Sequence, residues 1–330
     1  MDGRSAEARA SPAVRSPAVP VPAVRSPAVR SPAVRSPAVR SRGDVPQSSA
    51  PQSKGQLLSS RAVSLTRVFP SQQVASIVRH YWIPRWDIAD GAQVRQNVLD
   101  YPAMNLVIEA EDARLYRALR GRSIRTLTGS GWAFGALLQP GAGRRLLDAS
   151  ARSVPAAGMP IERLTAPGGR EVAAAVRDAY ANGVGEANET NEANDADRAM
   201  IAEFESWLVG LNLAPDPDAE RVRDIVTAVE SDRSLLRVDA LAAQFGIGVR
   251  RLQRLITEYI GFGPKWLIQR YRLQEAAHAL ADAAPPRIAD LAAALGYADQ
   301  AHFGREFKTV VGATPSEYLA DASRTRAEPA

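Results

Sequence analysis

The sequence of 330 residues contains no cysteine, and it has only four methionines and three histidines. Without cysteine the chain can form no disulfide, no thiolate metal site and no cysteine nucleophile. Its apolar residues never form an uninterrupted run of the roughly eighteen positions that a membrane-spanning helix needs. The first residues also lack the apolar run of a signal peptide, so we expect a cytoplasmic protein without a membrane partner.

The patterns of common catalytic and cofactor sites are absent as well. The histidines, at positions 80, 278 and 302, lie far apart in the sequence, and neither His-Glu-x-x-His nor Gly-x-Ser-x-Gly occurs. The glycine-rich run at residues 129–135 does not have the spacing of a phosphate loop. We therefore expect no catalytic residue, no metal site and no cofactor, and we do not expect an enzyme.

The net charge of +5 is concentrated at the start of the chain, where residues 1–60 hold nine Lys and Arg against three Asp and Glu. Residues 11–40 are six pentapeptides of the Ser-Pro-Ala-Val-Arg type. Proline at every fifth position prevents helices and sheet ladders. We predict a disordered basic tail over residues 1–60, which either adds non-specific DNA affinity or has no role.

Residues 61–213 are predicted to form a β-rich domain with C-terminal helices. Short apolar runs bounded by turn residues predict strands at 78–83, 105–109, 124–128 and 132–138. Their spacing favours a small barrel or sandwich. Two helices are expected at 171–180 and 198–211, and they either form a homodimer contact or pack on the strands.

The aromatic residues of this region have two open interpretations. Tyr81, Trp82, Trp132 and Phe134 could line a pocket for a small-molecule effector. Alternatively, they form part of the hydrophobic core, which is the more frequent role of such side chains.

The C-terminal third contains one pattern twice. Leu-Ala-Ala-Gln-Phe-Gly at 241–246 returns fifty residues later as Leu-Ala-Ala-Ala-Leu-Gly at 291–296, and the offset then becomes fifty-one. In each copy apolar residues at helical spacing precede a glycine, and a second amphipathic helix follows. Each copy therefore predicts a helix-turn-helix unit. Asp299 is expected to cap the second helix of the second copy.

The second helix of each copy has a polar face at matching positions. Arginine can read guanine and glutamine can read adenine in the DNA major groove, so these faces are predicted to bind DNA. The alternative is a solvated basic face, which is less consistent with the repetition. The predicted DNA-binding residues are Arg250, Arg251, Gln253, Arg254, Gln300, Ala301, Gly304, Arg305 and Lys308.

A single helix is predicted between the two copies. From Pro264 to Leu280 nothing interrupts it, and Pro285 and Pro286 follow. The sixteen residues from Lys265 to Leu280, at about 1.5 Å each, give a rod of roughly 24 Å. Such a rod can hold two recognition helices about 34 Å apart, which is one turn of DNA.

Residues 241–319 resemble the DNA-binding domain of the AraC/XylS family. The match includes Ile288, Ala292, Gly296 and Tyr297, followed by His-Phe-x-Arg-x-Phe-Lys at 302–308, Gly312, Pro315 and Tyr318. The sequence departs from the family pattern at Gly248, where a serine cap is frequent, and at Ile256, where phenylalanine is usual. The stretches FPSQQVASIVRHYW and GWAFGALLQPGA resemble, more weakly, the sensor-like domain found ahead of some such domains.

This resemblance implies a sequence-specific transcription regulator with residues 214–323 as its DNA-binding domain. Double-stranded DNA is the implied partner, with RNA polymerase as a second and a homodimer as a further expectation. The predicted fold is α+β and multidomain, with a small barrel-like β-rich domain and an all-α domain of two helix-turn-helix units joined by a long helix. The alternatives are a small-molecule-binding β-barrel protein and an enzyme delivered to DNA, and the absence of cysteine argues against an alkyl transferase.

Overall fold

The computed structural model describes residues 63–183 and 194–327. The predicted basic tail over residues 1–60 lies outside the described residues. The described residues all belong to one unit of the chain, residues 48–330. The assignment of residues 48–330 to one unit does not test the predicted domain boundary at residue 213, which stays a prediction.

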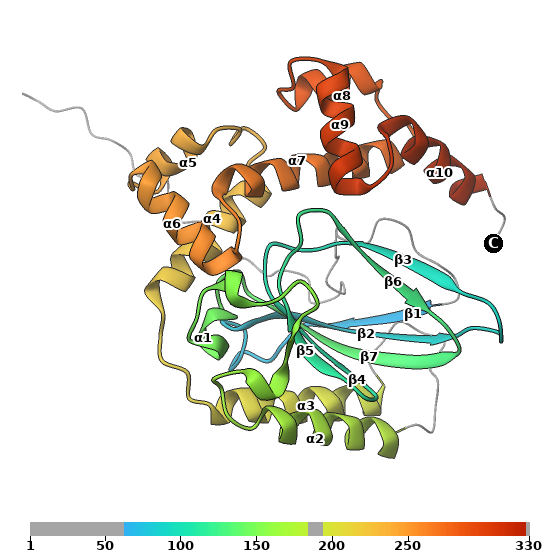
Figure 1. The fold of residues 1–330 in the computed structure, drawn as a ribbon, viewed down its shortest axis with the longest axis vertical. Coiled ribbons are helices and arrows are strands. Elements are labelled where there is room, and N and C mark those ends of the chain that lie inside the picture. The colour runs from blue at the N-terminus through green and yellow to red at the C-terminus, as the bar shows by residue number, and fades with distance from the viewer. Residues whose placement is uncertain (1–62, 184–193, 328–330) are drawn as a thin grey trace, which may run out of the picture. The chain divides into compact units, whose positions relative to one another are not determined.

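The N-terminal half of the described chain is built on an antiparallel sheet of six strands in the order β1-β2-β7-β4-β5-β8 (Figure 1). A separate pair, β3 and β6, forms a two-stranded antiparallel ribbon. The predicted runs at 78–83, 105–109, 124–128 and 132–138 correspond to β2, β4, β6 and β7. The strands are β1 Val63–Val68, β2 Val78–Asp87, β3 Val94–Leu99, β4 Asn105–Glu109, β5 Ala113–Tyr116, β6 Arg122–Leu127, β7 Ser130–Leu138 and β8 Met159–Pro160.

The predicted α+β class is confirmed, but the sheet is not closed into a barrel. Among the described residues, β1 and β8 stand at the two ends of the strand order and do not pair with each other. The two-residue strand β8 pairs only with β5, and β3 and β6 pair only with each other. Closure would require every edge strand to find a partner, so the sheet remains open.

Helices cover one part of this sheet. These are α1 Arg144–Leu147, α2 Gly169–Asn182 and α3 Asp195–Gly210, with two short 3-10 turns, η1 Ala151–Ser153 and η2 Ile161–Arg163. The helices α2 and α3 lie side by side (Figure 1) and confirm the two helices expected from the sequence. A capping box between Asn194 and Asp197 begins α3. The buried Asp197 also pairs with Arg85 of β2 at 2.6 Å, which ties α3 to the sheet.

The C-terminal half consists of helices, and it holds two hydrophobic clusters. The helices are α4 Pro217–Ser231, α5 Val238–Gln244, α6 Val249–Ile260, α7 Pro264–Ala281, α8 Ile288–Ala294, α9 Gln300–Val311 and α10 Pro315–Ala327. Leu267 and Ile268 of α7 pack in the cluster with α4, α5 and α6. Leu273 and Ala276 of the same helix pack in the cluster with α8, α9 and α10. The long helix is thus common to both cores.

The helix α4 begins at Pro217, after the non-helical residues 213–216. Pro217 occupies the first turn of the helix, where its missing N–H is not needed. Asp216 caps the helix by accepting hydrogen bonds from the amides of residues 218 and 219 at 3.1 and 3.0 Å. Its carboxylate also accepts the Tyr259 hydroxyl at 3.0 Å, which joins α4 to the end of α6.

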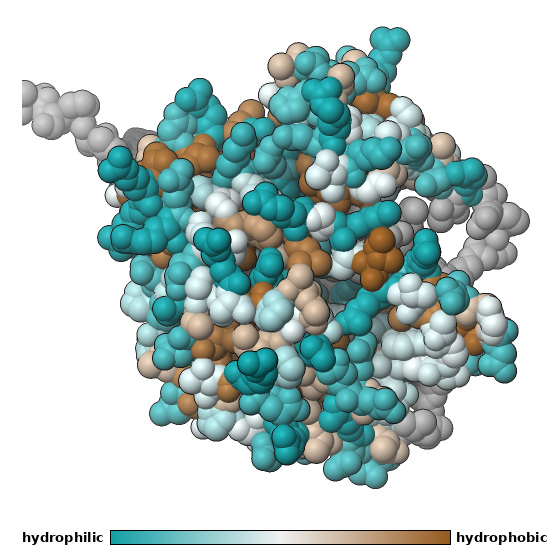
Figure 2. All heavy atoms as spheres, in the orientation of Figure 1, coloured by the Kyte–Doolittle hydropathy of each residue, from teal (hydrophilic) through white to brown (hydrophobic). Residues whose placement is uncertain are grey.

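The surface gives no sign of a membrane-spanning element. None of the helices in the described part of the chain is long and apolar enough to cross a membrane. In the view of Figure 2 hydrophilic residues cover much of the surface, and hydrophobic residues are scattered among them. This distribution is normal for a protein surface in contact with water.

The contact between Trp82 and Gly135 sets a requirement for glycine in the sheet. The two residues face each other across β2 and β7, and the Trp82 ring fills the space in which a Cβ at position 135 would lie. We expect Gly135→Ala to lower the free energy of unfolding by about 1–3 kcal/mol, because the ring must leave its position. Thermal and urea denaturation would measure this loss.

The double variant Gly135→Ala/Trp82→Ala tests the cause. If the ring is responsible, the combined loss is smaller than the sum of the two single losses. Gly210→Ala, at a helix position with open space around it, is the control and should stabilise the protein slightly. Additive losses would show that the ring does not require glycine at position 135.

Candidate nucleic-acid interface

The two predicted helix-turn-helix units have the same turn. In the first, Gly246 adopts a φ of 62° after α5, and in the second Gly296 adopts 75° after α8. The hydrogen bonds also correspond, because Ile247 N donates to Ala242 O at 3.1 Å and Tyr297 N donates to residue 292 O at 3.0 Å. A left-handed glycine with this bond is a Schellman motif. The repeat in the sequence is therefore a repeat in the backbone.

The helices that follow the turns differ in their caps. Asp299 accepts a hydrogen bond from the His302 amide at 2.6 Å and caps α9, as the sequence predicts. At the start of α6, Gly248 offers no side chain, and no side-chain cap is present. Both helices end at a left-handed glycine, Gly261 with a φ of 91° and Gly312 with a φ of 85°.

The predicted reading face of α6 is exposed. Leu252, Leu255, Ile256 and Tyr259 are buried against α4 and α7, as their spacing predicts. The opposite side of the helix is open to solvent and carries the predicted residues Arg250, Arg251, Gln253 and Arg254. Arg251 forms an ion pair with Asp218 at 3.7 Å. No ion pair of Arg250 or Arg254 occurs within the described residues, so their guanidinium groups are available to a ligand.

The predicted reading face of α9 is arranged in the same way. Phe303, Phe307 and Val311 are buried, while Val310 is only partly buried. The predicted residues Gln300, Ala301, Arg305 and Lys308 are exposed, and Gly304 is half-buried. With no side chain, Gly304 leaves the centre of this face flat and open.

A polar cluster that the sequence analysis does not identify fixes α9 to α7. Glu306 accepts a hydrogen bond from Gln269 of α7 at 2.8 Å and lies 3.3 Å from the His302 imidazole. The Tyr297 ring meets the His302 ring edge to face, with 5.3 Å between their centroids. Burial, followed by the neighbouring Glu306 carboxylate, raises the pKa of the Tyr297 phenol. These residues line a small cavity of about 160 Å³ between the two units.

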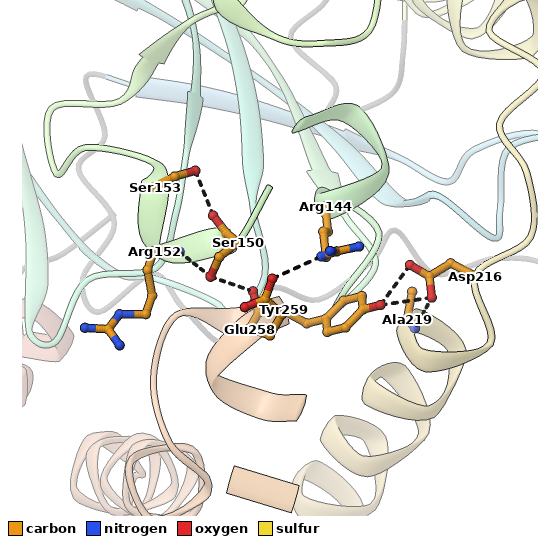
Figure 3. A network of polar contacts seen from close by, with 8 residues as sticks. All are labelled: Arg144, Ser150, Arg152, Ser153, Asp216, Ala219, Glu258 and Tyr259. Atoms are coloured by element: carbon orange, nitrogen blue, oxygen red, sulfur yellow. Dashed lines mark hydrogen bonds and ion pairs between the residues drawn. The ribbon is translucent and has the colours of Figure 1, made fainter. Parts of the chain in front are cut away.

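Polar contacts also join the N-terminal half of the described chain, called the sheet region from here on, to the helices α4 and α6. Arg79 of β2 pairs with Glu230 of α4 at 3.2 Å, and Glu230 accepts the Tyr101 hydroxyl at 2.6 Å. Arg144 of α1 pairs with Glu258 of α6 at 3.3 Å, and the Ser150 hydroxyl donates to the Glu258 carbonyl at 3.3 Å (Figure 3). Glu230 lies on α4 and Glu258 lies on α6, so the sheet region contacts these two helices at two separate places.

A buried arginine joins the sheet region to the centre of the long helix. Arg270 of α7 is only 1% exposed and donates a hydrogen bond to the Asp100 carbonyl. Burial lowers the pKa of Arg270 to about 10, so the guanidinium stays charged at neutral pH. The only hint of this contact in the sequence is a charged residue among the inward-facing positions of the helix.

The four predicted pocket residues lie on neighbouring strands, and they pack against other side chains. The rings of Tyr81 and Phe134 are fully buried and stack at 5.5 Å, and Phe204 of α3 lies 5.3 Å from Phe134. Trp132 stacks on Tyr180 at 4.1 Å. The Trp82 indole donates to the Asn105 side chain at 3.0 Å. These contacts describe a core, and the ligand-binding role of these residues stays a prediction.

The residues that the structure describes contain no group of three or more His, Asp or Glu side chains that could hold a metal ion. The three histidines remain apart: His80 is buried in β2, and the other two lie on α7 and α9. Burial, together with Arg67 and Arg79, lowers the pKa of His80 to about 4, which keeps it neutral. The groups that α6 and α9 expose to a ligand are thus cationic and amide side chains.

Two family models match the sequence. One is described as a helix-turn-helix domain and matches residues 241–321. The other is described as a domain of unknown function (DUF6597) and matches residues 66–156. No curated protein matches the chain.

Several solved structures are similar to parts of the chain. A transcriptional regulator with an AraC-type DNA-binding domain from Chromobacterium violaceum is 25% identical, with 34% of this chain and 96% of that chain covered and a TM-score of 0.30. The C-terminal domain of the response regulator AraT from Geobacillus stearothermophilus is 22% identical, with 32% and 86% covered and a TM-score of 0.29. ToxT from Vibrio cholerae is 15% identical, with 78% and 96% covered and a TM-score of 0.35.

The cap of α9 gives a prediction about the second unit. Asp299→Ala should destabilise this unit by about 1 kcal/mol, because the first amides of α9 lose their acceptor. Hydrogen exchange of the first turn of α9 would report the loss locally, beside the melting temperature of the whole protein. Asp299→Asn should have little effect, since asparagine caps helices equally well.

The matched change in the first unit is Gly248→Ser, which supplies the missing cap. It should protect the first turn of α6 and stabilise the protein by a few tenths of a kcal/mol. Equal losses for Asp299→Ala and Asp299→Asn would instead point to the charge of the carboxylate as the stabilising factor.

Proposed function

We propose that this chain, whose C-terminal region is an AraC-type helix-turn-helix domain, regulates transcription by reading DNA with both α6 and α9. One observation supports this most strongly. Two helices of twelve residues, each following the same glycine turn, expose cationic and amide side chains on equivalent faces. A single basic helix face could be a solvated surface. Its repetition in both units favours a function that uses two such faces.

The side chains present on these faces suit the major groove. Arg254 and Arg305 occupy equivalent positions of the two helices and can each donate two hydrogen bonds to guanine. Gln253 and Gln300 can bind adenine in the same two-point manner. Lys308, at the later end of the α9 face, is suited to a phosphate, which would fix the position of the helix without reading sequence.

The long helix supports the use of both reading helices on one DNA molecule. It runs from Pro264 to Ala281 and packs in the hydrophobic core of each unit. At about 1.5 Å per residue, its eighteen residues span roughly 27 Å. This length is of the order of one DNA turn, so the two helices would enter successive segments of the major groove.

The sheet region, which we place at residues 61–213, would supply sensing or self-association. The pair α2 and α3 packs on the sheet and leaves Val209 of α3 48% exposed, which is consistent with a contact in a homodimer. We further propose RNA polymerase as the partner of the DNA-bound protein, and residues 214–323 as the part that binds DNA.

The first test of this function is arginine replacement on the reading faces. Arg254→Ala and Arg305→Ala should each weaken binding to the cognate DNA site by about 1–3 kcal/mol, because a two-point contact to a base is lost. Fluorescence anisotropy with promoter fragments from beside the gene would measure the affinity. Circular dichroism should be unchanged, since both side chains are exposed.

Arg198→Ala is the matched control, because it removes an exposed arginine from α3, far along the chain from both reading helices. It should leave DNA affinity unchanged. If Arg254→Ala and Arg305→Ala bind the site as tightly as the unmodified protein, neither residue reads a base.

The second test is the footprint of the protein on its site. Hydroxyl-radical cleavage should show two protected segments whose centres are about 10 bp apart on one face of the DNA. The Arg305→Ala variant should weaken protection of one segment first. Protection of one groove segment alone would mean that a single unit reads DNA, and the role of α7 as a spacer would have to be abandoned.

A further inference from the structure

We propose that a cavity lined by three arginines, between the sheet region and the first helix-turn-helix unit, binds a phosphorylated small molecule. The cavity has a volume of about 410 Å³. Arg117, Arg120 and Arg152 line it from the sheet region, and Thr257 and the turn at 261–263 line it from the helices. No aspartate or glutamate is among the lining residues, so the cavity is strongly positive.

The three positive charges have no negative partner. Arg117 donates to two neutral carbonyl groups, those of Val154 at 2.8 Å and Ala118 at 3.2 Å. Within the described residues, no ion pair forms at Arg117, Arg120 or Arg152. Glu258, which follows the lining residue Thr257 in α6, is paired with Arg144.

Figure 3 shows the Arg152 side chain directed away from Glu258 and Ser150. Only the backbone amide of Arg152 contacts this network, through the Ser150 hydroxyl at 3.3 Å. The guanidinium therefore remains free to contribute to the cavity. Since like charges that share a small space repel each other, an anion bound between these arginines would be stabilised.

An aromatic ring positions two of the arginines. The guanidinium carbons of Arg120 and Arg117 lie 5.2 and 5.6 Å from the centre of the Phe262 ring. The Trp266 ring lies 4.3 Å from that of Phe262 and supports it. Cation–π contacts of this kind hold the heads of arginines in place without neutralising their charge. The N–H groups of Arg120, and those of Arg117 that do not donate to Val154 and Ala118, thus stay available to an incoming anion.

The second unit provides an internal comparison for the turn that lines this cavity. There, Thr314 and Glu317 exchange hydrogen bonds of 3.2 and 2.7 Å and cap α10 themselves. In the first unit Gly263 stands at the equivalent place and gives α7 no side-chain cap. The N-terminal end of α7, which has a partial positive charge, therefore adds to the positive electrostatic potential of the three arginines. These arginines are the main ligand-binding groups of the proposed site.

These features together select the class of ligand. The planar fork of arginine matches two phosphate oxygens at once, and the forks of Arg120 and Arg152, with the remaining N–H groups of Arg117, exceed what one carboxylate can use. The volume is within the range of small-molecule sites and leaves room for more than a free phosphate. We therefore assign the site to a phosphate ester, such as a sugar phosphate, held by its phosphate group.

The site would join two parts of the molecule through its ligand. Arg117 and Arg120 lie between β5 and β6, Arg152 lies in η1, and the opposite wall is the turn between α6 and α7. A bound phosphate would fasten these walls together. An effect of the bound ligand on DNA binding rests on the proposed function. Binding of the ligand itself does not rest on it.

Isothermal titration calorimetry and thermal melting of the full chain without DNA test the site. The probes are glucose 6-phosphate and pyrophosphate, with glucose as the uncharged control and succinate as the carboxylate control, all at one ionic strength. We expect saturable binding and a higher melting temperature with the two phosphate compounds only. Arg120→Gln/Arg152→Gln should weaken their binding about tenfold or more, and Arg120→Lys should have an intermediate effect.

The charge-matched control is Arg163→Gln/Arg170→Gln, which removes two exposed arginines outside the cavity. It should bind like the unmodified protein. Equal losses in both double variants, or no saturable binding at all, would overturn the site. Binding of succinate with the same affinity would overturn its assignment to phosphate.

DNA itself is another source of phosphate, and the same variants distinguish it. If the unmodified protein binds neither phosphate compound while Arg120→Gln/Arg152→Gln loses DNA affinity, the arginines contact the DNA backbone and the proposed ligand is wrong. A failure of Arg254→Ala to alter DNA binding would contradict the proposed function but would leave the titration with glucose 6-phosphate unaffected.

Discussion

The helical half of the molecule depends on the sharing of one helix by two hydrophobic cores. Leu267 and Ile268 complete the first core, and Leu273 and Ala276, about two turns later, complete the second. Because protein cores are close-packed, neither unit can rotate about α7 without losing its own packing. The separation and the relative rotation of the two reading helices are therefore fixed by the same residues that fold the units.

Between these two groups of apolar residues α7 buries a charge, Arg270, and the cost of this burial must be offset by its contacts. Its guanidinium donates to the carbonyl of Asp100, in the segment between β3 and β4. The carboxylate of Asp100 in turn accepts the Leu119 amide at 3.1 Å and the Ser123 hydroxyl. Burial raises the pKa of Asp100, while these hydrogen bonds and Arg270 oppose the increase. Asp100 thus holds both ends of the loop at 119–123, and Arg270 ties Asp100 to the centre of the long helix.

The sequence predicts the helical half well because its signals are local. Helical spacing of apolar residues, a glycine at each turn and an aspartate at one cap act within a few residues of the chain. In the sheet region β1, β3, β5 and the two-residue β8 were not predicted, since none of them contains three consecutive apolar residues as β2, β4 and β7 do. The contact of Arg270 with Asp100 joins residues 170 positions apart, so no local pattern could indicate it. The exposed polar faces of α6 and α9 were predictable, but the three-arginine cavity was not, because its walls come from separate segments.

The loop at 119–123 also shows how the repeat in the sequence reaches the sheet region. Arg120 lies over Phe262 in the turn that follows α6, and Arg122 occupies the space beside Gly312 in the equivalent turn that follows α9. Residues two positions apart in one loop therefore contact the equivalent turns of both units, at Phe262 in the first and at Gly312 in the second. Since Asp100 and Arg270 anchor this loop to the helix between them, a displacement of the loop must alter both turns together. A ligand held by Arg120 would for that reason act on the two reading units at once, rather than on one unit that passes the change through α7.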